Sequence, residues 1–156
     1  MIYDKINNNF TFNNNFVSLK VPGSYEGNED CLNLNVFTKV TNSTSLKPVM
    51  FWIHGGDFLY GSAPPYDPTS LVKEDVIVVS INYRLGALGF INFGNDLAPG
   101  NLGIRDQIQA LRWVKMMIWY FGGDPNRITI FGESAGGMSC HAITMSPKAY
   151  GLISGT

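Results

Sequence analysis

Cysteine and histidine are scarce in this chain of 156 residues, with two of each. Cys31 and Cys140 are too far apart for a CxxC redox pair, and the sequence has no cysteine–histidine spacing typical of a zinc site. We therefore predict no metal site. Free cysteine is usually a buried, apolar residue, so we predict two buried free thiols.

Charge is also sparse, at 15% of residues, and the net charge is −1. Eleven basic and twelve acidic residues are interspersed, which argues against a nucleic-acid surface or a polybasic membrane patch. No apolar run approaches the roughly 20 residues that span a bilayer. Residues 1–16 have no basic start and no apolar core, so they do not read as a signal peptide. The sequence does not assign a compartment.

The length and the 45% hydrophobic content suit one domain with a substantial core. Residues 1–20 are rich in asparagine and form a poorly determined lead-in, in which Phe10, Phe12 and Phe16 alternate like an edge strand. Val21–Ser24 reads as a turn. We expect one domain over residues 21–156.

Hydrophobic periodicity predicts an alternation of strands and helices. Continuous apolar runs are typical of strands buried on both faces of a parallel sheet, while spacings of three and four are typical of helices. The predicted strands are 32–36, 49–53, 76–81 and 128–131, and the predicted helices are 68–72 (capped by Asp67), 103–120 and 136–145. This order predicts the α/β class, with a mostly parallel sheet and flanking helices.

The most informative stretch is residues 128–137, Ile-Thr-Ile-Phe-Gly-Glu-Ser-Ala-Gly-Gly. A predicted strand enters a tight turn at Ser134 and a predicted helix follows, which is the context of a nucleophile elbow. Gly132 and Gly136 would let the two backbones approach. A bare G-x-S-x-G also arises by chance, so its strand–turn–helix context carries the inference.

A second stretch, Trp52-Ile-His-Gly-Gly-Asp-Phe58, follows the predicted strand 49–53. By itself it could be a glycine turn that leaves a strand. In a chain with an elbow, its backbone N–H groups and that of Ala135 could bind the oxyanion that forms during acyl transfer.

Five blocks in order resemble the type-B carboxylesterases, the cholinesterase-like branch of the α/β-hydrolases. The resemblance as a whole covers Glu29 to about Ser146. The matching blocks are Glu29–Val36, Trp52–Phe58, Ser80–Phe90, Asn101–Val114 and Phe121–Gly137.

The resemblance implies an α/β-hydrolase fold and hydrolysis of small-molecule carboxylic esters through an acyl-enzyme, without a cofactor. It implies that Ser134 is the nucleophile and that Gly56, Asp57 and Ala135 occupy the oxyanion-hole positions. Glu133 matches the glutamate of the elbow, and we expect it to face the pocket.

Two departures concern the chemistry. Asp57 stands where the family usually has glycine, and we expect its carboxylate to point away from the oxyanion. The family's acid and histidine lie beyond residue 156. His141 follows Ser134 by seven residues on one predicted helix, about 10 Å along its axis, which is too far for a hydrogen bond. His54 matches a structural position.

Further departures lie at the ends. The family's N-terminal sheet and the cysteine that would pair with Cys31 are missing, and the sequence after Pro147 is compressed. The sequence thus predicts a partial α/β-hydrolase that is truncated at both ends. We expect apolar faces to be exposed, and any complementing chain is unknown. The alternative hypothesis is a catalytically silent cholinesterase-like protein for binding or adhesion, or a non-functional fragment.

Overall fold

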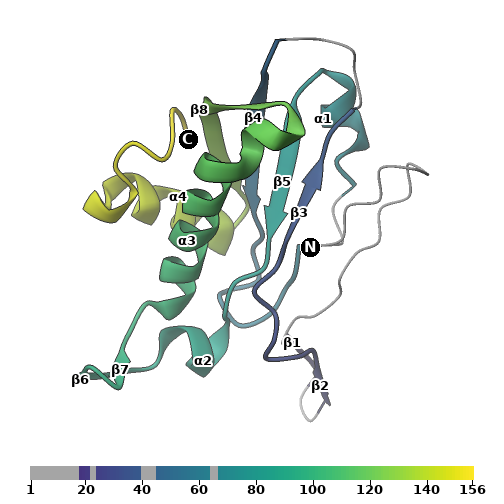
Figure 1. The fold of residues 1–156 in the computed structure, drawn as a ribbon. Coiled ribbons are helices and arrows are strands. Elements are labelled where there is room, and N and C mark those ends of the chain that lie inside the picture. The colour runs from purple at the N-terminus through teal and green to yellow at the C-terminus, as the bar shows by residue number, and fades with distance from the viewer. Residues whose placement is uncertain (1–17, 22–23, 40–44, 64–66) are drawn as a thin grey trace.

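The computed structural model describes residues 18–21, 24–39, 45–63 and 67–156 (Figure 1). The Asn-rich residues 1–17 and the turn residues 22–23 lie outside these ranges, so the predictions for them are not addressed. The elements in chain order are β1 Ser18–Val21, β2 Ser24–Glu26, β3 Leu34–Phe37, β4 Lys47–Ile53, α1 Thr69–Lys73, β5 Ile77–Ile81, α2 Gly86–Phe90, β6 Asn92–Asn95, β7 Ala98–Pro99, α3 Leu102–Met117, the 3₁₀ helix η1 Ile118–Phe121, β8 Gly123–Gly132, α4 Ala135–Met145 and the 3₁₀ helix η2 Pro147–Ala149.

The central sheet has the strand order β3-β5-β4-β8. Strand β4 runs parallel to β5 and to β8, while β3 pairs antiparallel with β5. All residues of β5 are buried, as its continuous apolar run predicts. The predicted mostly parallel sheet is confirmed.

Helices α3 and α4 cover one face of this sheet, and α1 lies on the other side (Figure 1). Val49, Phe51 and Ile53 of β4 are fully buried against the first face, because alternate residues of a strand point to the same side. From α3, Leu111 and Val114 enter the same core. The apolar residues whose spacing predicted α3 are thus residues that the helix buries against the sheet.

Several element boundaries differ from the predictions, and three of these differences have a clear local reason. The strand predicted at 32–36 is observed at 34–37, because the N–H of Asn33 turns back to the Cys31 carbonyl at 2.8 Å. The helix predicted through Tyr120 ends at Met117 and tightens into η1. Helix α1 begins one residue later than predicted, and its N-cap is Pro68 rather than Asp67. The Asp67 carboxylate, one position further out, accepts the Thr69 N–H at 2.9 Å.

Helix α2 and the β6–β7 pair form in the segment between β5 and α3, for which the apolar pattern gave no element. Strands β1 and β2 form an antiparallel pair on either side of the predicted turn. Cys31 and Cys140 are buried free thiols, as predicted.

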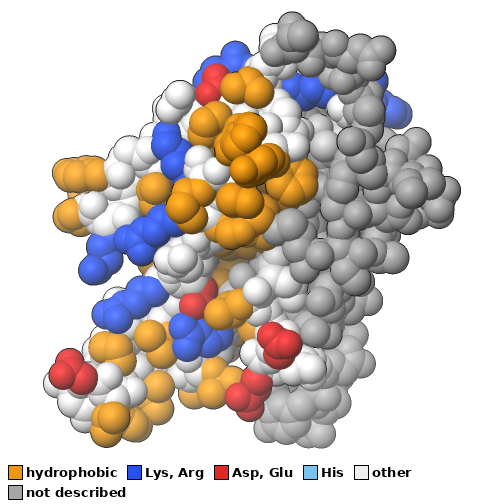
Figure 2. All heavy atoms as spheres, in the orientation of Figure 1, with side chains coloured by type: hydrophobic (Ala, Val, Ile, Leu, Met, Phe, Trp, Pro, Cys, Tyr) orange, Lys and Arg blue, Asp and Glu red, His pale blue; other side chains and the backbone are white. Residues whose placement is uncertain are grey.

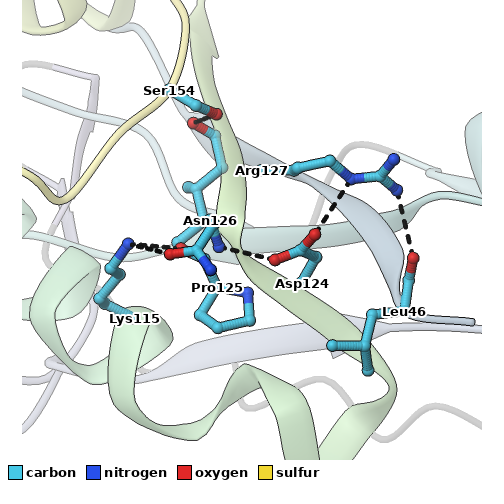
Figure 3. Close-up of polar contacts among 8 residues, drawn as sticks. Leu46, Lys115, Asp124, Pro125, Asn126, Arg127 and Ser154 are labelled. Atoms are coloured by element: carbon cyan, nitrogen blue, oxygen red, sulfur yellow. Dashed lines mark hydrogen bonds and ion pairs between the residues drawn. The ribbon is translucent and has the colours of Figure 1, made fainter.

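Strand β8 carries an insertion before its regular part. Gly123 pairs with Lys47, but the next pairing with β4 joins Ile128 to Val49, so residues 124–127 bulge out. Figure 3 shows how polar contacts hold this bulge: the Lys115 ammonium donates to the Pro125 carbonyl at 2.7 Å, and Arg127 lies 3.3 Å from Asp124. The regular pairing that begins at Ile128 brings Gly132 level with Ile53.

The outer edge of β8 carries a short parallel bridge. The N–H of Ser154 donates to the Ile128 carbonyl at 2.8 Å, and the N–H of Ile130 donates to the Gly155 carbonyl at 3.0 Å. Residues 154–155 therefore occupy the place of a further strand beside β8.

Apolar side chains remain at the surface, as we expected. Figure 2 shows them gathered over the C-terminal part of α3 and η1, where Met116, Trp119 and Tyr120 are each more than half exposed. On the other face of the sheet, Trp52 and Phe131 are half-buried and line a hollow of about 200 Å³. No helix in the described ranges is long and apolar enough to cross a bilayer.

Candidate active site

Ser134 lies in a sharp turn between β8 and α4. Its backbone has φ 54° and ψ −121°, a conformation that non-glycine residues rarely adopt, and its side chain is exposed. The turn is closed by the N–H of Gly136, which donates to the Glu133 carbonyl at 2.9 Å. The serine hydroxyl is therefore presented at the N-terminus of an 11-residue helix.

Gly132 and Gly136, two residues before and after Ser134, leave no space for a side chain. A Cβ at Gly132 would lie 2.5 Å from the Gly136 carbonyl carbon, and a Cβ at Gly136 would lie 2.0 Å from the Ile53 carbonyl oxygen. Strand β8, helix α4 and the end of β4 therefore meet at backbone distance. This approach brings the serine next to the loop that follows β4.

That loop packs directly on the serine turn. A Cβ at Gly55 would lie 2.7 Å from the Glu133 carbonyl oxygen and 3.2 Å from the Ser134 Cβ. Parallel strands that are neighbours in a sheet end at the same edge, which is why the segments after β4 and β8 converge. The two stretches singled out in the sequence are thus adjacent in space.

Beyond Gly55 the backbone makes a left-handed turn. Gly56 has φ 109°, and Asp57 and Phe58 have φ 54° and 60°. The Gly56 carbonyl accepts the N–H groups of Leu59 at 2.8 Å and Tyr60 at 3.0 Å. Aspartate is among the residues that tolerate this conformation, so the departure from glycine at position 57 is compatible with the turn.

Several N–H groups at this site have no backbone acceptor among the described residues, and those of Gly56, Asp57 and Ala135 are among them. For Ala135 the reason is general, because the first residues of a helix lack an intrahelical acceptor. For the other two, the left-handed turn uses the later N–H groups, at Leu59 and Tyr60, and leaves the earlier ones unpaired. Successive unpaired N–H groups form an anion-binding concavity.

Phe58 anchors this turn, and the sequence did not single it out. Its carbonyl accepts the N–H of Gly86 at 2.7 Å, and its ring packs edge-on against Phe90 at 5.0 Å between centroids. The turn is thereby tied to α2. The role of Phe58 follows from its backbone conformation in the structure, because a bulky residue in a left-handed conformation requires support from outside the turn.

His54 is 1% exposed and stacks on the ring of Tyr83 at 4.4 Å. Its Nδ1 donates to the Gly55 carbonyl at 2.8 Å, so Nδ1 carries the proton, and the Tyr83 hydroxyl donates to the His54 carbonyl at 2.8 Å. Burial lowers the pKa of His54, although the Gly55 carbonyl partly offsets this effect. The expected structural position of His54 fits these contacts.

The lowered pKa of His54 predicts a loss of stability in acid. Because the folded protein resists protonation of His54 and the unfolded chain does not, the free energy of unfolding should decline as the pH falls below about 6.5, by at most about 1.4 kcal/mol per pH unit. Urea unfolding from pH 8 to pH 5 measures this slope. His54→Asn should flatten it and His141→Asn, an exposed control, should not; equal slopes in all three proteins would contradict the prediction.

Glu133 is exposed and lies beside the glycine loop. Its Oε2 would be 2.8 Å from a Cβ at Gly55. This carboxylate therefore lies beside the loop, and that it faces a substrate pocket stays a prediction. His141 is exposed on α4. No three His, Cys, Asp or Glu side chains in the described part of the chain lie close enough to hold a metal ion.

The sheet order and the strand–turn–helix at Ser134 define an α/β-hydrolase fold. Comparison with known proteins identifies the group within this class. The sequence model of the carboxylesterase family matches residues 5–156, and the chain belongs to this family.

Individual relatives agree with this assignment. The chain is 52% identical over 129 residues to the pyrethroid hydrolase Ces2e of Rattus norvegicus, covering 81% of this chain and 23% of that protein. It is 52% identical over 130 residues to the para-nitrobenzyl esterase of Bacillus subtilis strain 168, covering 80% and 26%. A solved thermophilic PNB esterase superposes with a TM-score of 0.77 at 49% identity, covering 83% and 28%. The chain thus spans about a quarter of the length of these relatives.

Proposed function

We propose that the protein hydrolyses small-molecule carboxylic esters through an acyl-enzyme on Ser134. The observation that carries this proposal is the contact between the glycine loop and the serine turn, where a Gly55 Cβ would lie 3.2 Å from the Ser134 Cβ. This contact supports the proposal, because acyl transfer requires a nucleophile that lies beside free N–H groups.

In the proposed reaction the Ser134 oxygen attacks the ester carbonyl and its proton passes to a general base. The carbonyl oxygen becomes an oxyanion, which the N–H groups of Gly56, Asp57 and Ala135 stabilise. Each such donor contributes about a hundredfold to a thousandfold in rate. The alcohol then leaves, and water hydrolyses the acyl-serine. These steps use no cofactor.

The general base would come from outside residues 1–156. His54 is buried and holds the Gly55 carbonyl, and His141 lies about 10 Å along α4 from Ser134. The acid and the histidine would belong either to a longer polypeptide that contains these residues or to a second chain.

The names of the relatives support the reaction class and leave the substrate open. One is called a pyrethroid hydrolase and another a para-nitrobenzyl esterase, at the same identity to this chain. Ester hydrolysis is what these names share, and we propose that reaction for this protein.

One observation favours a second candidate, a catalytically silent protein that binds or adheres. Neither histidine of the chain is placed to activate Ser134, and a serine hydroxyl without a base is a weak nucleophile. Reactivity of the serine therefore separates the two candidates.

The test is labelling of the natural full-length protein with a fluorophosphonate, which modifies only activated serines. We expect the label on the peptide that contains Ser134, complete loss of the label in Ser134→Ala, and an unchanged label in Ser70→Ala, an exposed serine of α1. If the folded protein takes up no label, the esterase proposal fails and the silent candidate stands.

A further inference from the structure

The exposed side of α3 and η1 carries three large apolar side chains, which we call the aromatic patch. Met116 is 62% exposed, Trp119 51% and Tyr120 65%. The rings of Trp119 and Tyr120 lie against each other, 3.7 Å between centroids, within the apolar cluster that Figure 2 shows over this end of α3. The patch falls between the blocks Asn101–Val114 and Phe121–Gly137, so the resemblance to the carboxylesterases does not account for it.

The same side of α3 carries two arginines that lead to the patch. Arg105, Arg112 and Met116 lie in one line, because spacings of seven and four residues return to the same face of a helix. All three side chains are exposed. The Arg112 guanidinium is held on this face by Gln109 Oε1 at 3.4 Å and by the Lys148 carbonyl at 3.3 Å.

No acidic side chain of α3 or η1 is left to balance these arginines. The single acid of α3, Asp106, accepts two hydrogen bonds from the Arg84 guanidinium, at 2.7 and 2.8 Å. Near the patch, the carboxylate of Asp124 pairs with Arg127 at 3.3 Å. This side of the molecule therefore combines uncompensated positive charge with an apolar, aromatic end.

The aromatic patch is too small for a stable interface with a second protein molecule. Tryptophan and tyrosine bury about 150–250 Å² when fully buried, and about half of each is exposed here, so the patch with Met116 offers roughly 300–400 Å². A stable protein interface takes about 800 Å² from each partner. A lipid surface fits better, because tryptophan and tyrosine favour the boundary between membrane and water, and anionic head groups attract arginine.

We propose that the aromatic patch docks the protein on anionic lipid surfaces. The rings of Trp119 and Tyr120 lie among the head groups, and Arg105 and Arg112 face the lipid phosphates. The sequence has no polybasic run that would predict such a surface; the helix instead brings two arginines seven residues apart to the side that bears the patch. This inference does not depend on the reaction proposed at Ser134.

The patch and Ser134 lie at opposite ends of β8. This strand begins at Gly123, directly after η1 and one residue beyond Gly122, and it ends shortly before the serine. Its first residue is level with Lys47 of β4 and its last with Ile53, six residues further, so the two ends are about 20 Å apart. Substitutions in the patch should therefore leave the hydrolysis of a soluble ester unchanged, and this activity checks that each variant is folded.

The experiment measures binding of the natural full-length protein to phosphatidylcholine vesicles with and without phosphatidylglycerol. We expect binding to the anionic vesicles, and Trp119→Ala should weaken it about tenfold or more, since about 100 Å² of apolar surface is lost. Phe93→Ala is the matched control, because Phe93 is a 69% exposed aromatic residue of β6, outside the patch. Brominated lipid should quench the tryptophan fluorescence of the unmutated protein, and Trp119→Phe should remove this quenching.

The charge of the same surface is tested separately. Arg112→Gln should weaken binding to anionic vesicles about fivefold. Lys73→Gln should leave binding unchanged, since Lys73 is an exposed residue of α1 on the other side of the sheet.

Three results would overturn the inference: no binding of the folded protein to anionic vesicles, equal binding of Trp119→Ala and Phe93→Ala, or a molecular mass that doubles in the unmutated protein and not in Trp119→Ala. In the last case a second copy of the chain would cover the patch. If soluble esters are not hydrolysed and no fluorophosphonate label appears, the proposed function falls, while binding to vesicles still decides this inference.

Discussion

Replacing Gly136 by alanine is expected to destabilise the protein by about 3 kcal/mol or more and to abolish labelling at Ser134. The new Cβ would lie 2.0 Å from the Ile53 carbonyl oxygen and 2.9 Å from its carbonyl carbon, and both are backbone atoms at the end of β4. No rotamer change relieves a clash between two backbones, so the helix must move away from the sheet. Urea unfolding and fluorophosphonate labelling measure the two effects.

Gly137 provides the matched control, because it is the next residue of α4. A Cβ there meets only the Gly132 carbonyl oxygen, at 3.4 Å, which is an ordinary contact. Alanine is a better helix former than glycine by about 0.5–1 kcal/mol, so Gly137→Ala should leave the stability unchanged or raise it slightly. Equal stabilities of the two variants would mean that the strand and the helix do not approach as described.

The sheet could be predicted from the sequence because burial on both faces leaves an unambiguous apolar run, as in β5. The start of β3 could not be predicted in the same way. Leu32, Leu34 and Val36 alternate with polar residues and would all lie on one face of a strand. If the start of the strand is moved by two residues, every side chain therefore stays on the same face. Only the turn at Cys31–Asn33 decides that the strand starts at Leu34.

The sharp turn at Ser134 was also predictable, because it is built from residues only two positions away in sequence. The support of the glycine loop was not predictable, because it comes from distant residues. Phe58 depends on Phe90 of α2, and His54 depends on Tyr83, 29 residues away.

The start of β8 also differs from its prediction because of the bulge at residues 124–127. The apolar pattern predicts a strand that begins at Ile128, and the structure assigns β8 from Gly123. The regular ladder with β4 nevertheless begins at Ile128, because residues 124–127 bulge out and contact Lys115 instead. An apolar pattern identifies the residues that pair in the sheet, because this pairing buries their side chains. The pattern carries no information on extended residues that are held by polar contacts.

Replacing Gly56 by alanine is expected to lower kcat by about a hundredfold to a thousandfold with little change in KM. Gly56 has φ 109°, outside the left-handed region that other residues can enter, and a Cβ there would lie 2.0 Å from the Tyr60 carbonyl oxygen. The turn would have to open, which would move the N–H groups of Gly56 and Asp57 away from the proposed oxyanion position. An interaction made only in the transition state affects kcat rather than KM.

Gly94 separates this effect from a general cost of alanine at positive φ. It has φ 68° in the exposed β6–β7 pair, and a Cβ there would meet nothing within 4 Å. Gly94→Ala should therefore cost only about 1–2 kcal/mol of backbone strain and leave kcat unchanged. Steady-state kinetics on a neutral ester, at a temperature where both variants are folded, makes the comparison. A loss of less than tenfold in folded Gly56→Ala would remove the left-handed turn from the proposed mechanism, since the oxyanion would then be stabilised without it.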